Sequence, residues 1–248
     1  PEFINAYEIG TKKTFGARFQ ANASAFYYDY SDVQVPLSEI NVVTGSSVTN
    51  FYNLPKTTSM GFEVETIWYP TDRLQILANY AYLDAEIDEA CCFSDPDDPT
   101  GRQPGANVVG RTADPDGAGP REGSAAQDLA GQKFPNSIPH RVTVNANYTW
   151  DVMGGSLVAS ASYIWRDGGY SSQFNRWYNE FDAWGQADAR LVWRDADDKF
   201  TIIGFVRNVF DEEGPVSASG SRSNTAPTAG QPYAILSRTY VLNQPRTM

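Results

Sequence analysis

Apolar and polar residues alternate one for one along several segments of this chain. One such segment is 142–150, whose apolar members are Val142, Val144, Ala146, Tyr148 and Trp150. The same alternation runs through 19–27, 62–68, 74–82, 157–165 and 187–193. A period of two places successive side chains on opposite faces of a strand, so these segments predict strands with one apolar and one polar face. Segments 2–10 and 199–210 also indicate strands, although 200–206 is apolar on both faces.

The connections between the predicted strands alternate between short and long. Short turns containing Gly, Pro or Asp are expected at 11–16, 70–73, 151–155 and 195–198. Long loops are expected at 36–54, 89–137, 171–181 and 211–244. Such loops are uncommon in compact soluble domains, whereas short turns at one end and long loops at the other are typical of outer-membrane barrels. The pattern therefore predicts an all-β fold, a segment of an antiparallel up-and-down transmembrane β-barrel.

Aromatic residues gather at both ends of the apolar face. Trp68, Trp150 and Trp193 stand near the short turns, and near the long loops stand Tyr27, Tyr80, Tyr82, Tyr163 and Trp165. Such rows suit the two interfaces of a membrane, so we interpret these eight residues as a membrane-interface girdle around a lipid-facing aliphatic band. The alternative is a soluble β-sandwich in which the same face forms the core. The Ala-rich positions in mid-strand and the unequal loops favour the barrel.

Composition argues against several classes of function. The chain has 248 residues and a net charge of −11, which argues against nucleic acid as a partner. It has one histidine, His140, and two adjacent cysteines, Cys91 and Cys92, which either bridge each other or remain thiols. We find no catalytic motif and no metal-ligand spacing, so we expect no enzyme activity, no catalytic residues, no cofactor and no metal. No apolar run is long enough for a transmembrane helix.

Acidic residues concentrate in the longest predicted loop. Segment 89–137 holds eight acidic and four basic residues, and this excess would tend to repel anionic ligands. The acids include the cluster Asp95, Asp97 and Asp98. Its spacing does not match a calcium-binding loop, so we expect these residues to lie in solvated turns.

Several short motifs resemble the C-terminal barrel of TonB-dependent outer-membrane receptors. Residues 1–12 resemble the "PE…YE.G.K" strand of that family, and 26–30 resemble the strand that follows it. Residues 129–141 resemble its "L.G..(L/F)PNSP.HR" entry to a strand, 207–211 its "NLFD" segment, and 244–247 its "PRT" opening of the last strand. The motifs occur in the order in which the family has them.

The resemblance implies a piece of a 22-stranded barrel, with about eight strands and the start of a ninth. Residues 1–248 would form one partial barrel domain that lacks the plug domain and the end of the last strand. It would lie in the outer membrane of a Gram-negative cell, with periplasmic short turns and extracellular long loops. The implied partners are outer-membrane lipid, an extracellular nutrient ligand, and a TonB-type energy-coupling protein reached through the missing N-terminal part.

The implied function is energy-coupled uptake of a large, scarce nutrient such as an iron–siderophore complex. Glycan or cobalamin uptake by the same family and a passive outer-membrane porin are the alternatives. Because ligands of the family meet outer loops, the ligand-binding candidates are the clustered aromatics Tyr170, Phe174, Trp177 and Tyr178, which could equally be loop packing. The lumen-facing polar residues are Glu63, Glu65, Gln186, Asp188 and Arg190. For these we favour interior hydrogen bonds and ion pairs, or contacts with a plug, over direct ligand binding.

Overall fold

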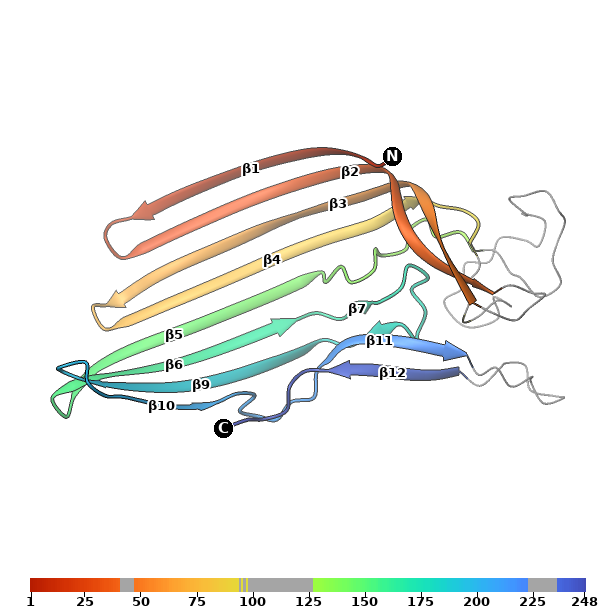
Figure 1. Ribbon diagram of the computed structural model, residues 1–248. Coiled ribbons are helices and arrows are strands. Elements are labelled where there is room, and N and C mark those ends of the chain that lie inside the picture. The colour runs from red at the N-terminus through yellow and green to blue at the C-terminus, as the bar shows by residue number, and fades with distance from the viewer. Residues whose placement is uncertain (41–46, 94, 96, 98–126, 223–235) are drawn as a thin grey trace, which may run out of the picture.

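A computed structural model describes residues 1–40, 47–93, 95, 97, 127–222 and 236–248. An eight-stranded antiparallel sheet in the order β1-β2-β3-β4-β5-β6-β9-β10 dominates it (Figure 1). The strands are β1 (Phe3–Phe15), β2 (Phe19–Ile40), β3 (Ser47–Thr71), β4 (Leu74–Glu89), β5 (His140–Val152), β6 (Gly155–Arg166), β9 (Trp184–Asp195) and β10 (Thr201–Val206). Two small ladders lie at the loop end, β7 (Gly169–Tyr170) with β8 (Glu180–Phe181) and β11 (Pro215–Arg222) with β12 (Leu236–Leu242).

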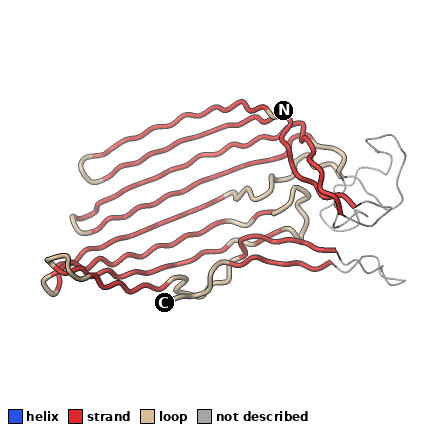
Figure 2. Tube along the Cα trace, in the orientation of Figure 1, coloured by secondary structure: helices blue, strands red, loops and turns tan. Residues whose placement is uncertain are grey.

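Strands, turns and loops make up the described chain, which confirms the predicted all-β class (Figure 2). No helix in this part of the chain is long and apolar enough to cross a membrane. The sheet is open, with β1 and β10 as its edge strands. An isolated antiparallel bridge joins Arg207, just after β10, to Thr247. This bridge lies where a ninth strand was expected to begin.

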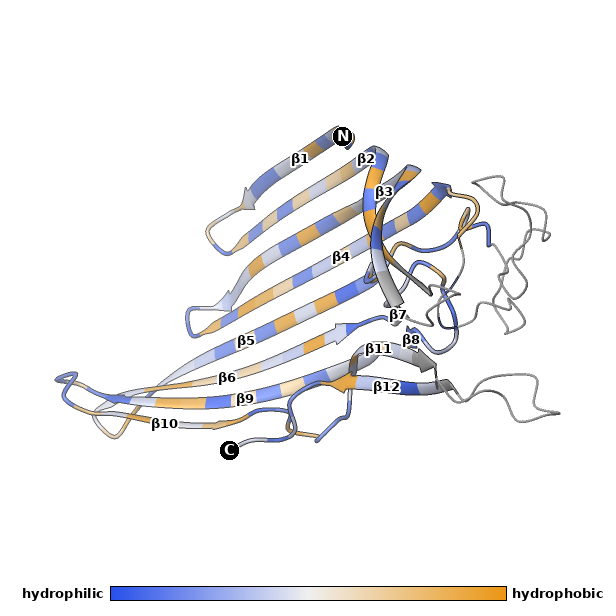
Figure 3. Ribbon diagram, turned by 45° about the vertical axis from the view of Figure 1, so that its right-hand side comes forward, coloured by the Kyte–Doolittle hydropathy of each residue, from blue (hydrophilic) through white to orange (hydrophobic). Residues whose placement is uncertain are grey.

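The hydrogen-bonded register brings the alternating segments into line. Phe19 pairs with Trp68, and the same row of pairs continues through Ile76, Ala146, Ala161 and Ala189. Because directly paired residues point to the same side of a sheet, the apolar positions of successive strands share one face. Figure 3 shows the result as alternating hydrophilic and hydrophobic bands along the strands. In β10, Ile202 pairs with Trp193 on the apolar face, whereas Phe205 pairs with Arg190 on the polar face.

The apolar face of the sheet is exposed. Tyr7, Leu191 and Ile202 are 64%, 53% and 65% exposed, respectively, although each lies on this face. A β-sandwich would bury these positions against a second sheet about 10 Å away. Within the described residues no second layer covers them, so the sandwich alternative is wrong.

The packed core lies instead at the loop end of the sheet. At Asp32, whose φ is 60°, the register between β2 and β3 passes from Ser31 opposite Lys56 to Val33 opposite Leu54. Beyond this point the hairpin bends over the loops (Figure 1). There it completes a cluster of buried residues, namely Val35, Leu37, Leu54, Ile87, Ala90, Leu129 and Phe174. A smaller cluster consists of Ile138, Phe181 and Ala218.

Three predicted connections are wrong. Residues 36–40 and 47–54 belong to β2 and β3 rather than to a loop, because this hairpin continues into the loop-end core, where Leu37 and Leu54 are buried. Residues 11–15 extend β1, so the turn falls at 16–18. The predicted loop 211–244 contains β11 and β12. Most of the predicted loop 89–137, comprising 94, 96 and 98–126, lies outside the described residues.

Replacing Leu54 tests whether the loop-end core stabilises the protein. Leu54→Ala should lower the free energy of unfolding by about 2–5 kcal/mol, because Leu54 is fully buried and the surrounding cluster cannot collapse completely. Urea unfolding of the purified protein in detergent, followed by tryptophan fluorescence, measures this change. The control Phe51→Ala, at a ring that is 71% exposed, should alter stability by less than about 0.5 kcal/mol. Equal losses in the two variants would contradict the assignment.

Candidate functional site

Segment 167–183 crosses the loop end between β6 and β9. The short β7–β8 ladder closes it, and Asn175 holds its tip against the preceding loop. The Asn175 side chain accepts a hydrogen bond from the backbone N–H of Lys133 at 2.6 Å and donates one to the Lys133 carbonyl at 2.9 Å. Asn175 has a φ of 47°, a conformation that Asn tolerates better than most residues. Segment 127–137 and segment 167–183 are thereby joined into one platform.

A buried charge pair lies inside this platform. Arg176 Nε is 3.3 Å from Asp95 Oδ2, and both side chains are fully buried. The Tyr178 hydroxyl donates a hydrogen bond to the same carboxylate oxygen. Burial, followed by the neighbouring charge of Asp95, raises the pKa of Tyr178. Tyr178 therefore stays a neutral donor. Asp95 was expected in a solvated turn and is instead a structural anion, while Asp98 lies outside the described residues.

A hollow of about 330 Å³ opens beside this pair. Its lining combines residues 217–220 with polar residues that include Asp95, Asp97, Ser171, Ser172 and Asn179. Hydroxyl, amide and carboxylate groups at a loop end can hydrogen-bond a polar ligand. This hollow is therefore a candidate for ligand contact outside the sheet.

The four predicted ligand-binding aromatics gather around the same loop. Phe174 belongs to the loop-end core, and Tyr178 is fully buried in the Asp95 network. Trp177 is 41% exposed and meets Tyr178 edge-on, with ring centroids 5.5 Å apart. Tyr170 is half-buried in β7. Ligand binding by these four residues stays a prediction, and Trp177 presents the most accessible ring.

The predicted girdle residues lie in two rows on the apolar face. Trp150 pairs with Leu157, which in turn pairs with Trp193, at the turn end. At the loop end Tyr80 pairs with Val142, and the ring of Tyr80 lies 5.6 Å from that of Phe62. The other predicted girdle residues lie on the same face, with Trp68 close to the β3–β4 turn, and with Tyr27, Tyr82, Tyr163 and Trp165 further from the turns.

His140 joins the loop-end row, which sequence reasoning did not foresee. Its Nδ1 lies 2.8 Å from the Tyr80 hydroxyl, and its ring centroid is 5.2 Å from that of Tyr82. The signal was present in the sequence, because His140 continues the apolar positions Val142 and Val144 at a spacing of two. The single histidine is thus part of an aromatic cluster.

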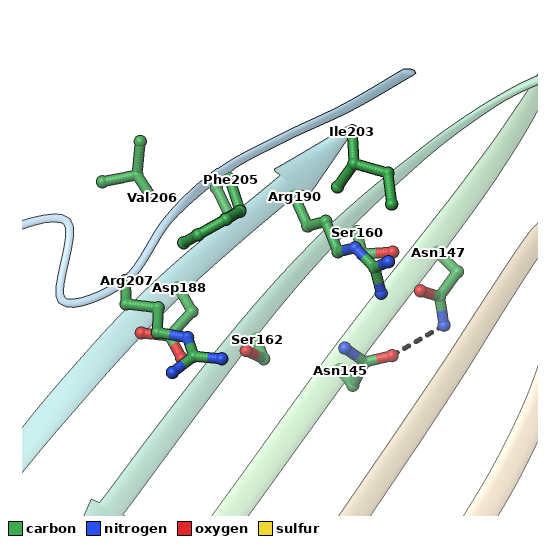
Figure 4. Close-up of a pocket in the computed structure, with 11 residues that line it drawn as sticks. Asn145, Asn147, Ser160, Ser162, Asp188, Arg190, Ile203, Phe205, Val206 and Arg207 are labelled. Atoms are coloured by element: carbon green, nitrogen blue, oxygen red, sulfur yellow. Dashed lines mark hydrogen bonds between the residues drawn. The ribbon is translucent and has the colours of Figure 1, made fainter. Parts of the chain in front are cut away.

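The predicted lumen-facing residues all lie on the polar face. Glu65 accepts a hydrogen bond from Asn22 at 3.4 Å, and Asp188 accepts one from Gln186 at 2.9 Å. Glu63 and Arg190 occupy the same face by register. Strands β5, β6, β9 and β10 form a second hollow there, of about 670 Å³ (Figure 4). Its polar lining comprises Asn145, Asn147, Ser160, Ser162, Asp188, Arg190 and Arg207.

The remaining motif positions support turns. Asn208, with a φ of 51°, is buried and donates hydrogen bonds to the carbonyls of Glu212 at 2.9 Å and Gln244 at 3.1 Å. Asn136 has a φ of 58° at the entry to β5. Cys91 and Cys92 form a disulfide with each other at the start of the long loop.

A family model described as "TonB dependent receptor-like, beta-barrel" matches residues 1–209. The chain belongs to this family. The family consists of receptors and transporters, which agrees with the expectation that the chain is not an enzyme. The open sheet is accordingly a segment of a TonB-dependent receptor barrel.

Solved receptor structures share the fold. The ferric yersiniabactin uptake receptor FyuA from Yersinia pestis is 16% identical with a TM-score of 0.65, over 99% of this chain and 28% of that one. The siderophore receptor PiuA from Acinetobacter baumannii is 18% identical with a TM-score of 0.60, over 98% and 27%. The copper transporter OprC is 13% identical with a TM-score of 0.60, over 99% and 30%. The chain thus spans under a third of these proteins. No curated protein matches it.

Removing Asp95 tests the buried pair. Asp95→Asn should lower the free energy of unfolding by about 3–5 kcal/mol, because the buried Arg176 guanidinium loses the charge of its partner. The control Asp72→Asn breaks an exposed pair with Arg18, whose atoms are 2.8 Å apart, and should cost less than about 1 kcal/mol. Urea unfolding in detergent compares the two variants. If both changes are equally mild, the Asp95 pair does not hold the platform together.

Proposed function

We propose that residues 1–248 are part of the barrel of an outer-membrane receptor that takes up a large, scarce nutrient. The observation that carries this proposal is the sorting of side chains by the register. One face of the sheet is apolar, exposed and bordered by aromatic rows, and the other is polar. Membership of the TonB-dependent receptor family supports the same function.

Lipid is the partner that suits the apolar face. Soluble monomers rarely expose a contiguous apolar patch larger than a few hundred Å². Here exposed apolar side chains recur from Ile9 on β1 to Ile202 on β10. Lipid hydrocarbon around the aliphatic band removes this surface from water, which stabilises the protein by about 25 cal/mol for each Å². The aromatic rows then lie at the two interfaces, where Trp and Tyr rings are favoured.

This orientation places the short turns in the periplasm and the loop-end platform outside the cell. Ligand recognition then falls to the platform and its hollow of about 330 Å³. Trp177 is the aromatic side chain best placed for first contact, since Phe174 and Tyr178 are enclosed. A TonB-type protein of the inner membrane supplies energy through a plug in the N-terminal part of a longer receptor.

An iron–siderophore complex is the proposed nutrient. FyuA and PiuA, which share the fold, are described as a ferric yersiniabactin uptake receptor and a siderophore receptor. Glycan or cobalamin uptake would use the same wall with different loops. A passive porin would use it without energy coupling.

A matched pair of substitutions tests which face meets lipid. Ala161→Arg, in the middle of the apolar face of β6, should lower the free energy of unfolding in lipid vesicles by about 2–4 kcal/mol. Ser160→Arg, its neighbour on the polar face, should change this free energy by less than about 1 kcal/mol. Urea titration of the vesicle-inserted protein gives both values. The opposite order would place lipid on the polar face and overturn the orientation.

Iron uptake tests the transport function. The full-length receptor, expressed in cells that lack their own siderophore receptors, should accumulate radioactive iron from a ferric siderophore. Accumulation should stop when the energy-coupling protein is deleted or a protonophore is added, because the proposed transport is driven by the proton gradient across the inner membrane. Uptake that persists after both treatments would favour a porin, and a receptor that takes up no tested ferric siderophore would reject the iron proposal.

A further inference from the structure

The two cysteines of the chain form a disulfide between neighbouring residues, Cys91 and Cys92. They lie just beyond the end of β4 at Glu89, where the chain leaves the sheet for the long loop. Cys91 is exposed and Cys92 is half-buried, so small molecules in the solvent can reach the bridge. A disulfide between adjacent residues joins no distant segments, and its effect on the structure is therefore local.

The disulfide lies between two backbone contacts with segment 127–137. Before it, the Ala90 carbonyl accepts a hydrogen bond from the N–H of Leu129 at 2.8 Å. After it, Phe93 and Gln127 exchange two backbone hydrogen bonds, of 3.0 and 2.7 Å. Ala90, Leu129 and Gln127 are buried. We call these two sets of bonds the flanking contacts, and the cysteines span the short stretch of chain between them.

The second flanking contact leads directly to the buried charge pair. Phe93 packs against the loop-end core, with its ring centroid 5.7 Å from that of Tyr52. Two residues later Asp95 pairs with Arg176, and the N–H of Asp97 donates to Asp95 Oδ1 at 2.9 Å. Asp95 and Asp97 both line the hollow of about 330 Å³. The shape of this hollow therefore depends on how firmly the chain after the disulfide is held.

A bond between adjacent side chains restricts the backbone of both residues. It closes a small ring that contains the peptide unit joining them, in the folded state and in any locally opened state. Because fixing a free backbone costs conformational entropy, a chain that is already restricted loses less when it folds into place. Reduction removes this restriction, so the flanking contacts should open more often in the dithiol form.

We propose that the Cys91–Cys92 disulfide is a thiol-exchange site at which a small extracellular thiol loosens the platform. A thiolate attacks Cys91 Sγ, the S–S bond breaks, and Cys92 leaves as a thiolate that takes up a proton. A second thiol molecule displaces Cys91 from the mixed disulfide. The protein thus gains two electrons and two protons, and the two small thiols become one disulfide. The extracellular position rests on the orientation proposed above, whereas the exchange chemistry does not.

Local charge favours one class of thiol. Segment 86–97 contains five acidic residues and no basic one, and Glu89 is exposed near the disulfide. Lys56, Lys133 and Arg176 lie beside this segment, so the acids still outnumber these bases. A negative potential repels anionic reactants. The thiolate of glutathione is a multiply charged anion, whereas the thiolate of cysteamine has no net charge. Cysteamine is therefore the favoured reductant.

Hydrogen exchange of the full-length receptor in detergent, measured by mass spectrometry, tests the proposal. After reduction by cysteamine, the backbone amides of Phe93, Gln127 and Leu129 should exchange at least about tenfold faster, because the flanking contacts open more often. Amides within β5 and β6 should not change. The double variant Cys91→Ser with Cys92→Ser should show the fast exchange without any thiol and no response to cysteamine. This variant also controls for cysteines elsewhere in the longer receptor.

Glu89→Gln is the matched control for local charge. Maleimide labelling of the released thiols gives the reduction rates, each divided by the rate of the same thiol with an uncharged disulfide peptide. At low salt cysteamine should be roughly threefold faster than glutathione or more, and Glu89→Gln or added salt should narrow this difference. The variant should not alter exchange of the oxidised protein.

Three outcomes would overturn the thiol-exchange site. The first is unchanged exchange at Phe93 and Gln127 after complete reduction, and the second is free thiols at Cys91 and Cys92 in receptor purified without a reductant. The third is equal relative rates for the two thiols, which would reject the part played by local charge. None of these measurements involves iron. The site therefore stands if no ferric siderophore is taken up, and it falls alone if iron uptake is normal but reduction leaves exchange unchanged.

Discussion

The cross-strand register is the constraint on which the rest of this structure depends. Pairing runs without interruption along β1 and β2 from Phe3 opposite Ser31 to Phe15 opposite Phe19, and it continues across the sheet to Ile202 opposite Trp193. A slip of one residue in any strand would move its side chains to the opposite face. Tight turns help to fix the register, and Gly16 and Gly154 adopt the positive φ that these turns require. The apolar wall, the aromatic rows and the polar face all follow from this alignment.

Apolar side chains are exposed along the wall of the sheet and buried at its loop end. Along the wall, apolar side chains point away from the protein, so their stabilisation must come from the surrounding medium. At the loop end, Leu54, Ile87 and Leu129 form a protein core of their own, and the buried pair of Arg176 and Asp95 lies beside it. The bend at Asp32 couples the regions, because it turns a wall hairpin into a cover for the loops. The loop-end platform is therefore packed around its own core, whereas the sheet below it has an exposed apolar face.

Sequence reasoning succeeded where the geometry is local and failed where partners are distant. A period of two assigns faces directly, so the apolar and polar sides of β5, β6 and β9 could be predicted from residues such as Val144 and Ser160. In β10 both faces are apolar, and only pairing with β9 assigned Ile202 and Phe205. Asp95 looked solvated because its partner Arg176 belongs to a distant segment. For the same reason the sequence could not separate the enclosed ring of Tyr178 from the accessible ring of Trp177.

Net charge conceals how charges are arranged on the polar face. The chain carries −11 overall, and Glu63 and Glu65 follow this average on β3. The strip from β5 to β10 differs, because Arg141, Arg166 and Arg190 lie on its polar face. The Arg166 guanidinium also lies 4.8 Å from the ring centroid of Phe181 and 5.7 Å from that of Trp184. Register thus arranges charge as well as hydrophobicity, since the pairing that places Ala161 and Leu191 on one face places Arg190 on the other.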